Sequence, residues 1–233
     1  MTAVTELADS LLAAAQPAPI ETHPFIERVL AGTLPKDIVR EYALLIYSIA
    51  SVFPRRIAAV LSICPQQDVR RALINNLLEE EGVTSFQPEV GASVVADRRH
   101  SSMAAKFARA AGATDADIAA QDPAPSRWFA DAIASGDWLG AYAYFAVGHE
   151  ANVPRTFRML VPALIEHYGF TQDELEFLTE HYVADERHGR EAAEMLASIA
   201  EEPAARERTL EGARRGGMAW WLMHRQLLRA HGC

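Results

Sequence analysis

Three polar residues interrupt the inward face of a segment that otherwise has the pattern of an amphipathic helix. Residues 181–196 read HYVADERHGREAAEML, with apolar side chains at helical spacing to the end. His181, Asp185 and His188 fall at positions i, i+4 and i+7 and therefore share one face. Burying a polar group without a partner costs about 1–3 kcal/mol. A bound iron, manganese or zinc ion would satisfy all three residues. The alternative is a core histidine with its own hydrogen-bond partner, or an intrahelical Asp–His pair.

One helix rarely fills a coordination sphere, so other segments must contribute ligands. Residues 75–83, NNLLEEEGV, place Glu79, Glu80 and Glu81 at the end of a predicted helix. Carboxylates are unfavourable at the negative end of a helix dipole. The triplet therefore indicates either a solvated helix end or a ligand-bearing segment.

A second candidate lies in residues 142–154, YAYFAVGHEANVP, where Glu150 stands in an aromatic, apolar stretch just before Pro154. Its alternative is a salt bridge to Arg155. The neighbouring His149 must point in another direction and is interpreted as structural.

The elements that position these residues are predicted to be almost all helical. Proline and glycine breakers divide the chain into blocks, and we find neither an Asn-Gly hairpin signal nor an alternating strand pattern. The expected helical blocks are 22–31, 36–64, 67–81, 98–111, 124–135, 138–168, 172–200 and 203–230, with kinks at Pro54 and Pro154. Residues 83–97 lack clear periodicity and are expected to form a long loop or a short helix. We expect residues 1–233 to form a single all-α domain.

Composition and charge argue against several classes of protein. Half of the 233 residues are hydrophobic, and a formal charge of −9 without a basic cluster argues against a nucleic-acid partner. Residues 1–15 carry acids where a signal peptide needs basic residues. The longest apolar run, residues 42–53, is too short to span a bilayer. Cys64 and Cys233 form no metal or redox motif, which fits a reducing compartment. We therefore expect a soluble, cytoplasmic protein with no membrane partner.

The chain resembles the haem-oxygenase-like superfamily that includes TenA, PqqC and the CADD-type 4-aminobenzoate synthases. It looks most like the branch that uses two irons instead of haem. The segments that carry the resemblance are HPFIERVLAGTLPKDIVREYALL at 23–45, NNLLEEEG, HSSMAAKFARAAGA at 100–113, GHEANVP and FLTEHYVADERHGRE. They occur in order along nearly the whole chain. The resemblance implies a helical bundle of about seven to eight helices.

Carried over position by position, the resemblance implies a set of six metal ligands. These are Glu80, His100, Glu150, His181, Asp185 and His188. Three histidines and three carboxylates suit a dinuclear non-haem iron site, and the family uses such sites to activate O2.

The chain departs from close relatives between the first two implied ligands, because 19 residues separate Glu80 from His100. This longer stretch contains Glu89, a possible extra carboxylate ligand of the kind found in amine N-oxygenating relatives. It also contains Asp97, an alternative first ligand.

Other departures concern the neighbouring activities in the superfamily. The 4-aminobenzoate synthases place a sacrificial tyrosine near the positions of Ile26 and Glu27, so self-sacrifice is not expected here. A TenA-type thiaminase needs a nucleophilic cysteine, whereas Cys64 is interpreted as structural. PqqC works without a metal. His23 lies near the position of the haem ligand in haem oxygenases, and its simpler interpretation is a helix-start residue.

The resemblance therefore implies a diiron oxygenase or oxidase with two irons per subunit and O2 as co-substrate. The expected substrate is a small, amino-acid-derived molecule of specialised biosynthesis, oxidised by N-oxygenation or oxidative C–C cleavage. A homodimer is expected. The alternatives are a metal-free enzyme of the TenA or PqqC type and a non-catalytic helical metal-binding protein. The aromatic residues that could line a substrate pocket, or belong to the core, are Tyr47, Phe53, Trp138, Tyr142 and Phe145.

Overall fold

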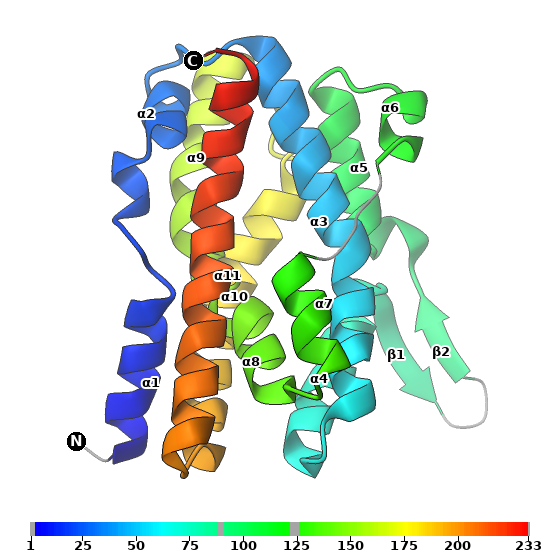
Figure 1. Ribbon diagram of the computed structural model, residues 1–233. Helices are drawn as coiled ribbons and strands as arrows, with labels where there is room; N and C mark the ends of the chain where they lie inside the picture. Colours follow the sequence, from blue (N-terminus) through cyan, green and yellow to red (C-terminus); the bar gives the residue numbers. More distant parts are fainter. Residues whose placement is uncertain (1–2, 88–90, 122–125, 233) are drawn as a thin grey trace.

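The computed structural model describes residues 3–87, 91–121 and 126–232, and the side chains of residues 84–87, 91, 92 and 183–187 lie outside this description. Figure 1 shows a bundle of helices with one small hairpin at its side. The α-helices are α1 (Ala3–Ala14), α2 (Pro24–Leu30), α3 (Lys36–Ile63), α4 (Gln67–Glu80), α5 (His100–Ala110), α6 (Asp115–Ala119), α7 (Arg127–Ala134), α8 (Trp138–Tyr142), α9 (Val153–Tyr168), α10 (Glu176–Ile199) and α11 (Pro203–Ala230). The short elements are the 3₁₀-helices η1 (Ile20–Thr22) and η2 (Ala96–Arg98), the π-helix η3 (Ala143–Val147), and the strands β1 (Val83–Gln87) and β2 (Gly91–Val94).

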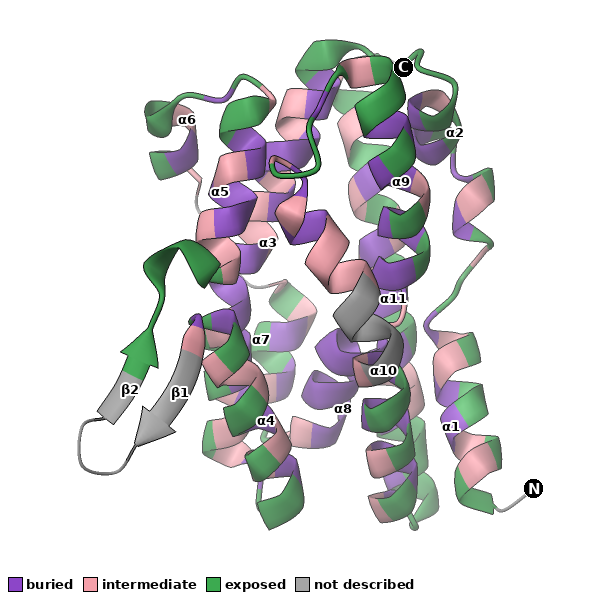
Figure 2. Cartoon of the chain, turned by 180° about the vertical axis from the view of Figure 1, so that it is seen from behind, coloured by how far each residue is buried: buried purple, intermediate pink, exposed green. Residues whose placement is uncertain are grey.

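The long helices form the frame of the molecule. α9 packs against α10, α5 packs against α3, and α11 packs against α8 and η3. The N-terminal helix α1 lies along α10 and α11, and the chain ends near the start of α3 (Figure 1). Seen from behind in Figure 2, the buried faces of these helices turn toward one another and their outer faces are exposed.

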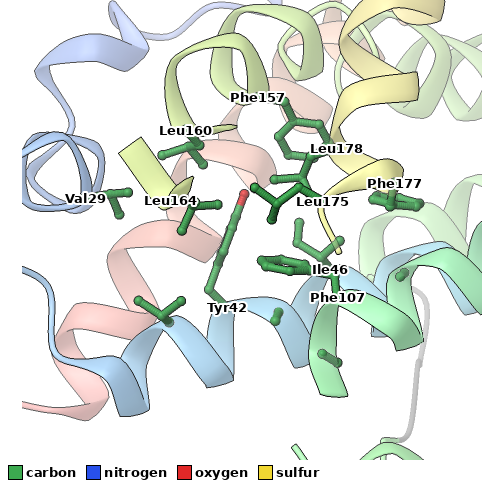
Figure 3. Close-up of a cluster of buried hydrophobic side chains, with 14 of the residues drawn as sticks. Val29, Tyr42, Ile46, Phe107, Phe157, Leu160, Leu164, Leu175, Phe177 and Leu178 are labelled. Atoms are coloured by element: carbon green, nitrogen blue, oxygen red, sulfur yellow. The ribbon is translucent and has the colours of Figure 1, made fainter. Parts of the chain in front are cut away.

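Two clusters of buried side chains make up the core. The first contains Tyr42, Phe107, Phe157 and Leu164, and joins α2 and the first half of α3 to α5 and α9 (Figure 3). The second joins the second half of α3 to α1, α7, α8 and η3, with Phe145 among its fully buried side chains. The long helices α3, α10 and α11 contribute to both clusters, so they connect the two halves of the bundle.

Glycines bring α11 unusually close to the segment that carries Glu150. A Cβ atom on Gly212 would overlap the backbone of Gly140, and one on Gly216 would overlap the carbonyl oxygen of Tyr144. Only residues without a side chain allow the two backbones to approach this closely. α11 therefore fixes the position of α8 and η3.

The prediction of an all-α bundle is confirmed, but the described residues contain eleven α-helices where about seven to eight were expected. The additional helices are the N-terminal α1 and short segments such as α6. The predicted block 138–168 is divided into α8, η3 and α9 by irregular backbone that lies before Pro154. The break in the helix therefore begins about one turn before Pro154, whereas α3 continues as one α-helix through Pro54.

The expectation of a loop or short helix at residues 83–97 was wrong. β1 and β2 pair as an antiparallel hairpin, with Val83 opposite Val94 and Gln87 opposite Gly91. The hairpin stands at the side of the bundle (Figure 1). The strand sequences VTSFQ and GASV carry little of the apolar alternation that reveals a strand.

Among the described helices, α3 is the one that is long and apolar enough to cross a membrane by length and composition alone. Its apolar residues have partners inside the bundle, because α3 packs against both α4 and α5. Tyr42, Ile46 and Ile57 on this helix are almost fully buried. The composition of α3 is thus accounted for by its place in the core.

Candidate metal centre

Three of the implied ligands converge from three different helices. Glu80 is the last residue of α4, His100 is the first residue of α5, and His181 lies in the second turn of α10. One ligand atom from each residue lies within 4.8 Å of the other two. Glu80 is buried, and His100 and His181 are half-buried. A buried carboxylate beside two imidazoles is a donor set that suits iron.

Local contacts orient the two imidazole rings. The Nδ1 atom of His181 lies 2.7 Å from the carbonyl oxygen of Phe177, one turn earlier in α10. A ring that donates from Nδ1 leaves Nε2 available as a metal ligand. The His100 and His181 rings are in edge contact, with centroids 4.5 Å apart. The Nδ1 atom of His100 lies 2.9 Å from Oε1 of Glu80.

Glu150 reaches the site through the π-helix η3. In this segment the amide of Gly148 donates to Ala143 and the amide of Glu150 donates to Phe145, each five residues earlier. Such π-bulges occur often at functional sites. The Glu150 side chain is buried, and the Asn76 side-chain amide on α4 donates to its Oε1 atom at 3.3 Å. Asn76 thus positions a second buried carboxylate.

His188 also lies in the cavity wall, about two turns after His181 on α10, and its Nε2 atom lies 3.9 Å from Oε2 of Glu79. Gly189 lets this part of α10 approach Ala151 closely. The backbone of Asp185 lies between the two histidines on α10, but its side chain is outside the described residues, as is the whole of Glu89.

The ligand-type residues surround one cavity of about 300 Å³. Its polar side holds five of the six implied ligands, namely Glu80, His100, Glu150, His181 and His188. Its apolar side is formed mainly by Ile46, Ala50, Phe53, Val153, Phe157, Phe177 and Trp220. Ligand pockets are typically apolar cavities with a few convergent polar groups. The cavity lies where the two core clusters meet, since Phe53 belongs to one and Phe157 to the other.

Of the five aromatic residues considered for the pocket, the structure places Phe53 in the cavity wall. Tyr142 and Phe145 lie behind the wall in the core. The Phe145 and Phe53 rings pack against each other with their centroids 5.4 Å apart. Trp138 packs at the edge of the same cluster. Tyr47 faces a separate surface depression together with Asp97, so neither lines the cavity. Asp97 therefore lies away from the position of a first ligand.

The sequence interpretation missed most of the apolar wall. Ile46, Ala50 and Phe53 lie on one face of α3 at helical spacing, a signal that was present but indistinguishable from that of an ordinary core stripe. Phe157 and Trp220 come from α9 and α11, which only the tertiary fold brings together.

Two buried polar residues next to the site, His149 and Arg56, have unpaired atoms. Both ring nitrogens of His149 and the Nε and Nη1 atoms of Arg56 are buried without a hydrogen-bond partner. Burial, with a smaller contribution from the nearby Arg56 charge, lowers the pKa of His149 to about 3. His149 lines the cavity, so its interpretation as purely structural is incomplete.

His23 and Cys64 have structural positions. The Nδ1 atom of His23 accepts a hydrogen bond from the Phe25 amide at 3.1 Å, which caps the N-terminus of α2. Cys64 is buried at the end of α3, and burial raises the pKa of its thiol. A raised pKa disfavours the thiolate that a nucleophilic cysteine needs.

Comparison with known proteins gives relatives over most of the chain. The model of a family described as iron-containing redox enzyme matches residues 40–221. A 4-aminobenzoate synthase from Chlamydia muridarum (strain MoPn / Nigg) is 26% identical over 202 residues, which cover 82% of this chain and 77% of that protein. A 4-aminobenzoate synthase from Chlamydia trachomatis serovar D is 27% identical over 192 residues, covering 78% of this chain and 75% of that protein.

Two solved structures share the fold. The crystal structure of a TenA homologue from Pseudomonas syringae pv. tomato str. DC3000 superposes with a TM-score of 0.74 at 15% identity, covering 97% of this chain and 92% of that one. A domain with a haem-oxygenase-like fold from Shewanella denitrificans OS217 superposes with a TM-score of 0.68 at 18% identity, covering 98% and 90%. The bundle is therefore haem-oxygenase-like, as expected.

Proposed function

Since this chain belongs to the family of iron-containing redox enzymes, we propose that it is a dinuclear non-haem iron oxygenase or oxidase that uses O2 to oxidise a small, amino-acid-derived molecule. One observation carries the proposal. Five of the six ligand-type residues line a single cavity whose opposite wall is apolar. Glu80 and Glu150 are buried carboxylates, and a buried carboxylate is costly unless its charge is balanced, as a bound cation would do.

The residues that would hold the two irons are Glu80, His100, Glu150, His181, Asp185 and His188. Bound iron would supply the redox chemistry that activates O2, which amino-acid side chains cannot provide. The chain contributes orientation, since Phe177 fixes the His181 ring and Asn76 holds the Glu150 carboxylate.

The apolar wall of the cavity would contact the substrate. Phe53, Phe157 and Phe177 contribute aromatic rings to this wall. Where substrate displaces water from such a site, electrostatic interactions at the ligands become stronger. Ile26 and Glu27 stand where the 4-aminobenzoate synthases place a sacrificial tyrosine, and neither has an oxidisable phenol. The proposed substrate is therefore a free small molecule.

Two measurements test the proposal. Anaerobic titration with ferrous iron should saturate at about two irons per chain, because six ligand-type residues are available. Oxygen consumption by the loaded protein should depend on an added amino-acid-derived compound. A stoichiometry of zero would favour a metal-free enzyme of the TenA or PqqC type. Iron binding without substrate-dependent oxygen consumption across a metabolite library would favour a non-catalytic metal-binding protein.

A further inference from the structure

Arg56 is a buried cation without a counter-charge. Its side chain lies on α3, and the whole residue is only 7% exposed. Its Nε and Nη1 atoms have no hydrogen-bond partner. Among the side chains that the structure describes, no carboxylate forms an ion pair with it. Buried arginines are normally paired, because a cation is strongly destabilised away from water.

The ionisable groups that interact with Arg56, Tyr144 and His149, do not neutralise its charge. Burial lowers the pKa of Arg56, and Tyr144 is the one group that opposes this shift. A guanidinium nevertheless stays protonated in proteins. Its charge also acts on His149, whose two ring nitrogens are unpaired. Arg56 and His149 together present unused hydrogen-bond donors to one region of the core.

This region adjoins the cavity described above. Arg56 follows Phe53, a residue of the cavity wall, by one turn of α3. His149 is itself part of the wall, with its ring 6.2 Å from that of Trp220. The Trp220 indole donates to Thr156 and so has a protein partner already. The ring nitrogens of His149 therefore lack the kind of hydrogen-bond partner that the neighbouring Trp220 indole has.

We infer that the cavity takes a small organic carboxylate, with Arg56 as the buried counter-charge and His149 as a hydrogen-bond partner of the anionic group. The inference rests on the proposed function and names the substrate class of the same site. An arginine is suited to this role, because its fixed charge and several donors match a carboxylate. The apolar wall formed by Ile46, Phe157 and Phe177 accommodates the rest of the molecule.

The charges around the cavity determine where in it an anion can bind. Glu79, Glu80, Glu150 and Glu180 line the cavity, and they repel an anion unless metal neutralises them. With acidic residues in the cavity wall and an unpaired arginine beside it, a ligand is favoured that directs its carboxylate toward His149 and Arg56.

The experiment measures binding of matched probes by calorimetry to ferrous protein without O2. The probes are benzoate and hexanoate, with benzamide and hexanamide as uncharged controls. We expect at least one carboxylate to bind at least about tenfold more tightly than its amide, and Arg56→Gln to remove that preference. Arg56→Lys should retain part of it, and His149→Phe should weaken it. Arg55→Gln is the matched control, because Arg55 is exposed and its loss changes the net charge equally.

The thermal midpoint of each variant shows whether Arg56 is instead a structural residue. A cation without a partner destabilises the ligand-free protein, so Arg56→Gln should keep or raise the midpoint and reduce the increase produced by the carboxylate. Equal binding of carboxylates and amides, unchanged carboxylate binding in Arg56→Gln, or no binding of either carboxylate at millimolar concentration would overturn the inference. Iron stoichiometry, measured on the same samples, separates this outcome from failure of the diiron proposal. Repeating the titration without metal shows whether iron alone attracts the anion.

Discussion

The Nδ1 atom of His100 lies 2.9 Å from Oε1 of Glu80, although 19 residues separate the two in sequence. The hairpin accounts for this proximity. Gly82 turns the chain out of α4 with a φ of +67°, and the amide of Val95 donates back to the Gly82 carbonyl at 3.0 Å. The residues between Gly82 and Val95 therefore leave the helical bundle and return to it at nearly the same point. The long separation in sequence does not separate the two side chains.

Removing the histidines of α10 should remove iron. We expect His181→Ala and His188→Ala each to lower the bound iron to about one per chain or less, because each deletes a neutral nitrogen ligand. Far-ultraviolet circular dichroism should remain helical, since neither side chain is fully buried. His167→Ala, at an exposed histidine outside the cavity, is the control. Full iron content in either cavity variant would refute the ligand assignment.

Asn76 should act by positioning Glu150. Asn76→Ala removes the donor to the Glu150 carboxylate, and loss of such a supporting contact typically weakens metal affinity by about 10–100-fold. Competition with a chromogenic iron chelator would measure the change. The neighbouring Asn75 is exposed, so Asn75→Ala should bind iron as the parent protein does. Equal affinities in the two variants would show that the contact is dispensable.

The buried hydroxyl of Tyr42 should lower stability. Figure 3 shows it pointing among Leu164, Leu175 and Leu178, and it has no hydrogen-bond partner. Tyr42→Phe should raise the free energy of unfolding by about 1 kcal/mol, since an unpaired polar group leaves the core.

The comparison is Tyr168→Phe, where the lost hydroxyl accepts a hydrogen bond from the Leu34 amide at 3.0 Å. That change should lower the free energy of unfolding by about 1 kcal/mol. Urea denaturation measures both variants. Destabilisation of similar size in both would mean that the Tyr42 hydroxyl has a stabilising partner.

Stability should decline in mildly acidic solution because of two buried histidines. Burial lowers the pKa of His23 to about 4 and that of His224 to about 3. In the unfolded chain both titrate near 6.5, so below that pH the unfolded state binds more protons. The contribution is fully present above about pH 6.5 and decreases as the pH falls toward 4 and then 3.

Urea midpoints measured between neutral pH and pH 4 should show this decline, and His224→Leu should make it shallower. His167→Gln, at an exposed histidine, is the control for replacement of an imidazole. The parent protein and both variants would show the same dependence of the urea midpoint on pH if the acid sensitivity arose elsewhere, for example in the carboxylates of the metal centre.

The sequence predicted the helical frame because proline and glycine punctuate long helices clearly. The expected block 36–64 and the observed α3 (Lys36–Ile63) differ by one residue at one end. His181 and His188 could be selected as candidate ligands because polar residues on an otherwise apolar helix face are unusual.

Other features depend on contacts between distant segments and could not be predicted in the same way. The hairpin is held by backbone pairing that leaves no apolar alternation in the sequence. Phe157 and Trp220 join one wall only after α9 and α11 have packed. Arg56 is one of two adjacent arginines in the sequence, and its burial in the fold distinguishes it from the exposed Arg55.

The π-helix before Glu150 bears on how the site responds to small genetic changes. Its backbone hydrogen bonds span five residues, so each of its turns holds about one residue more than the 3.6 of an α-helix. Losing one codon between Ala143 and Val147 would therefore tighten the segment to ordinary α-helix and leave Glu150 on nearly the same face of the helix. The glycine contacts with α11 involve Gly140 and Tyr144, and much of this interface precedes or begins the altered turn. A descendant could thus lose one residue here and keep both the bundle and the ligand. Along this lineage the length of the segment can change while its chemistry persists.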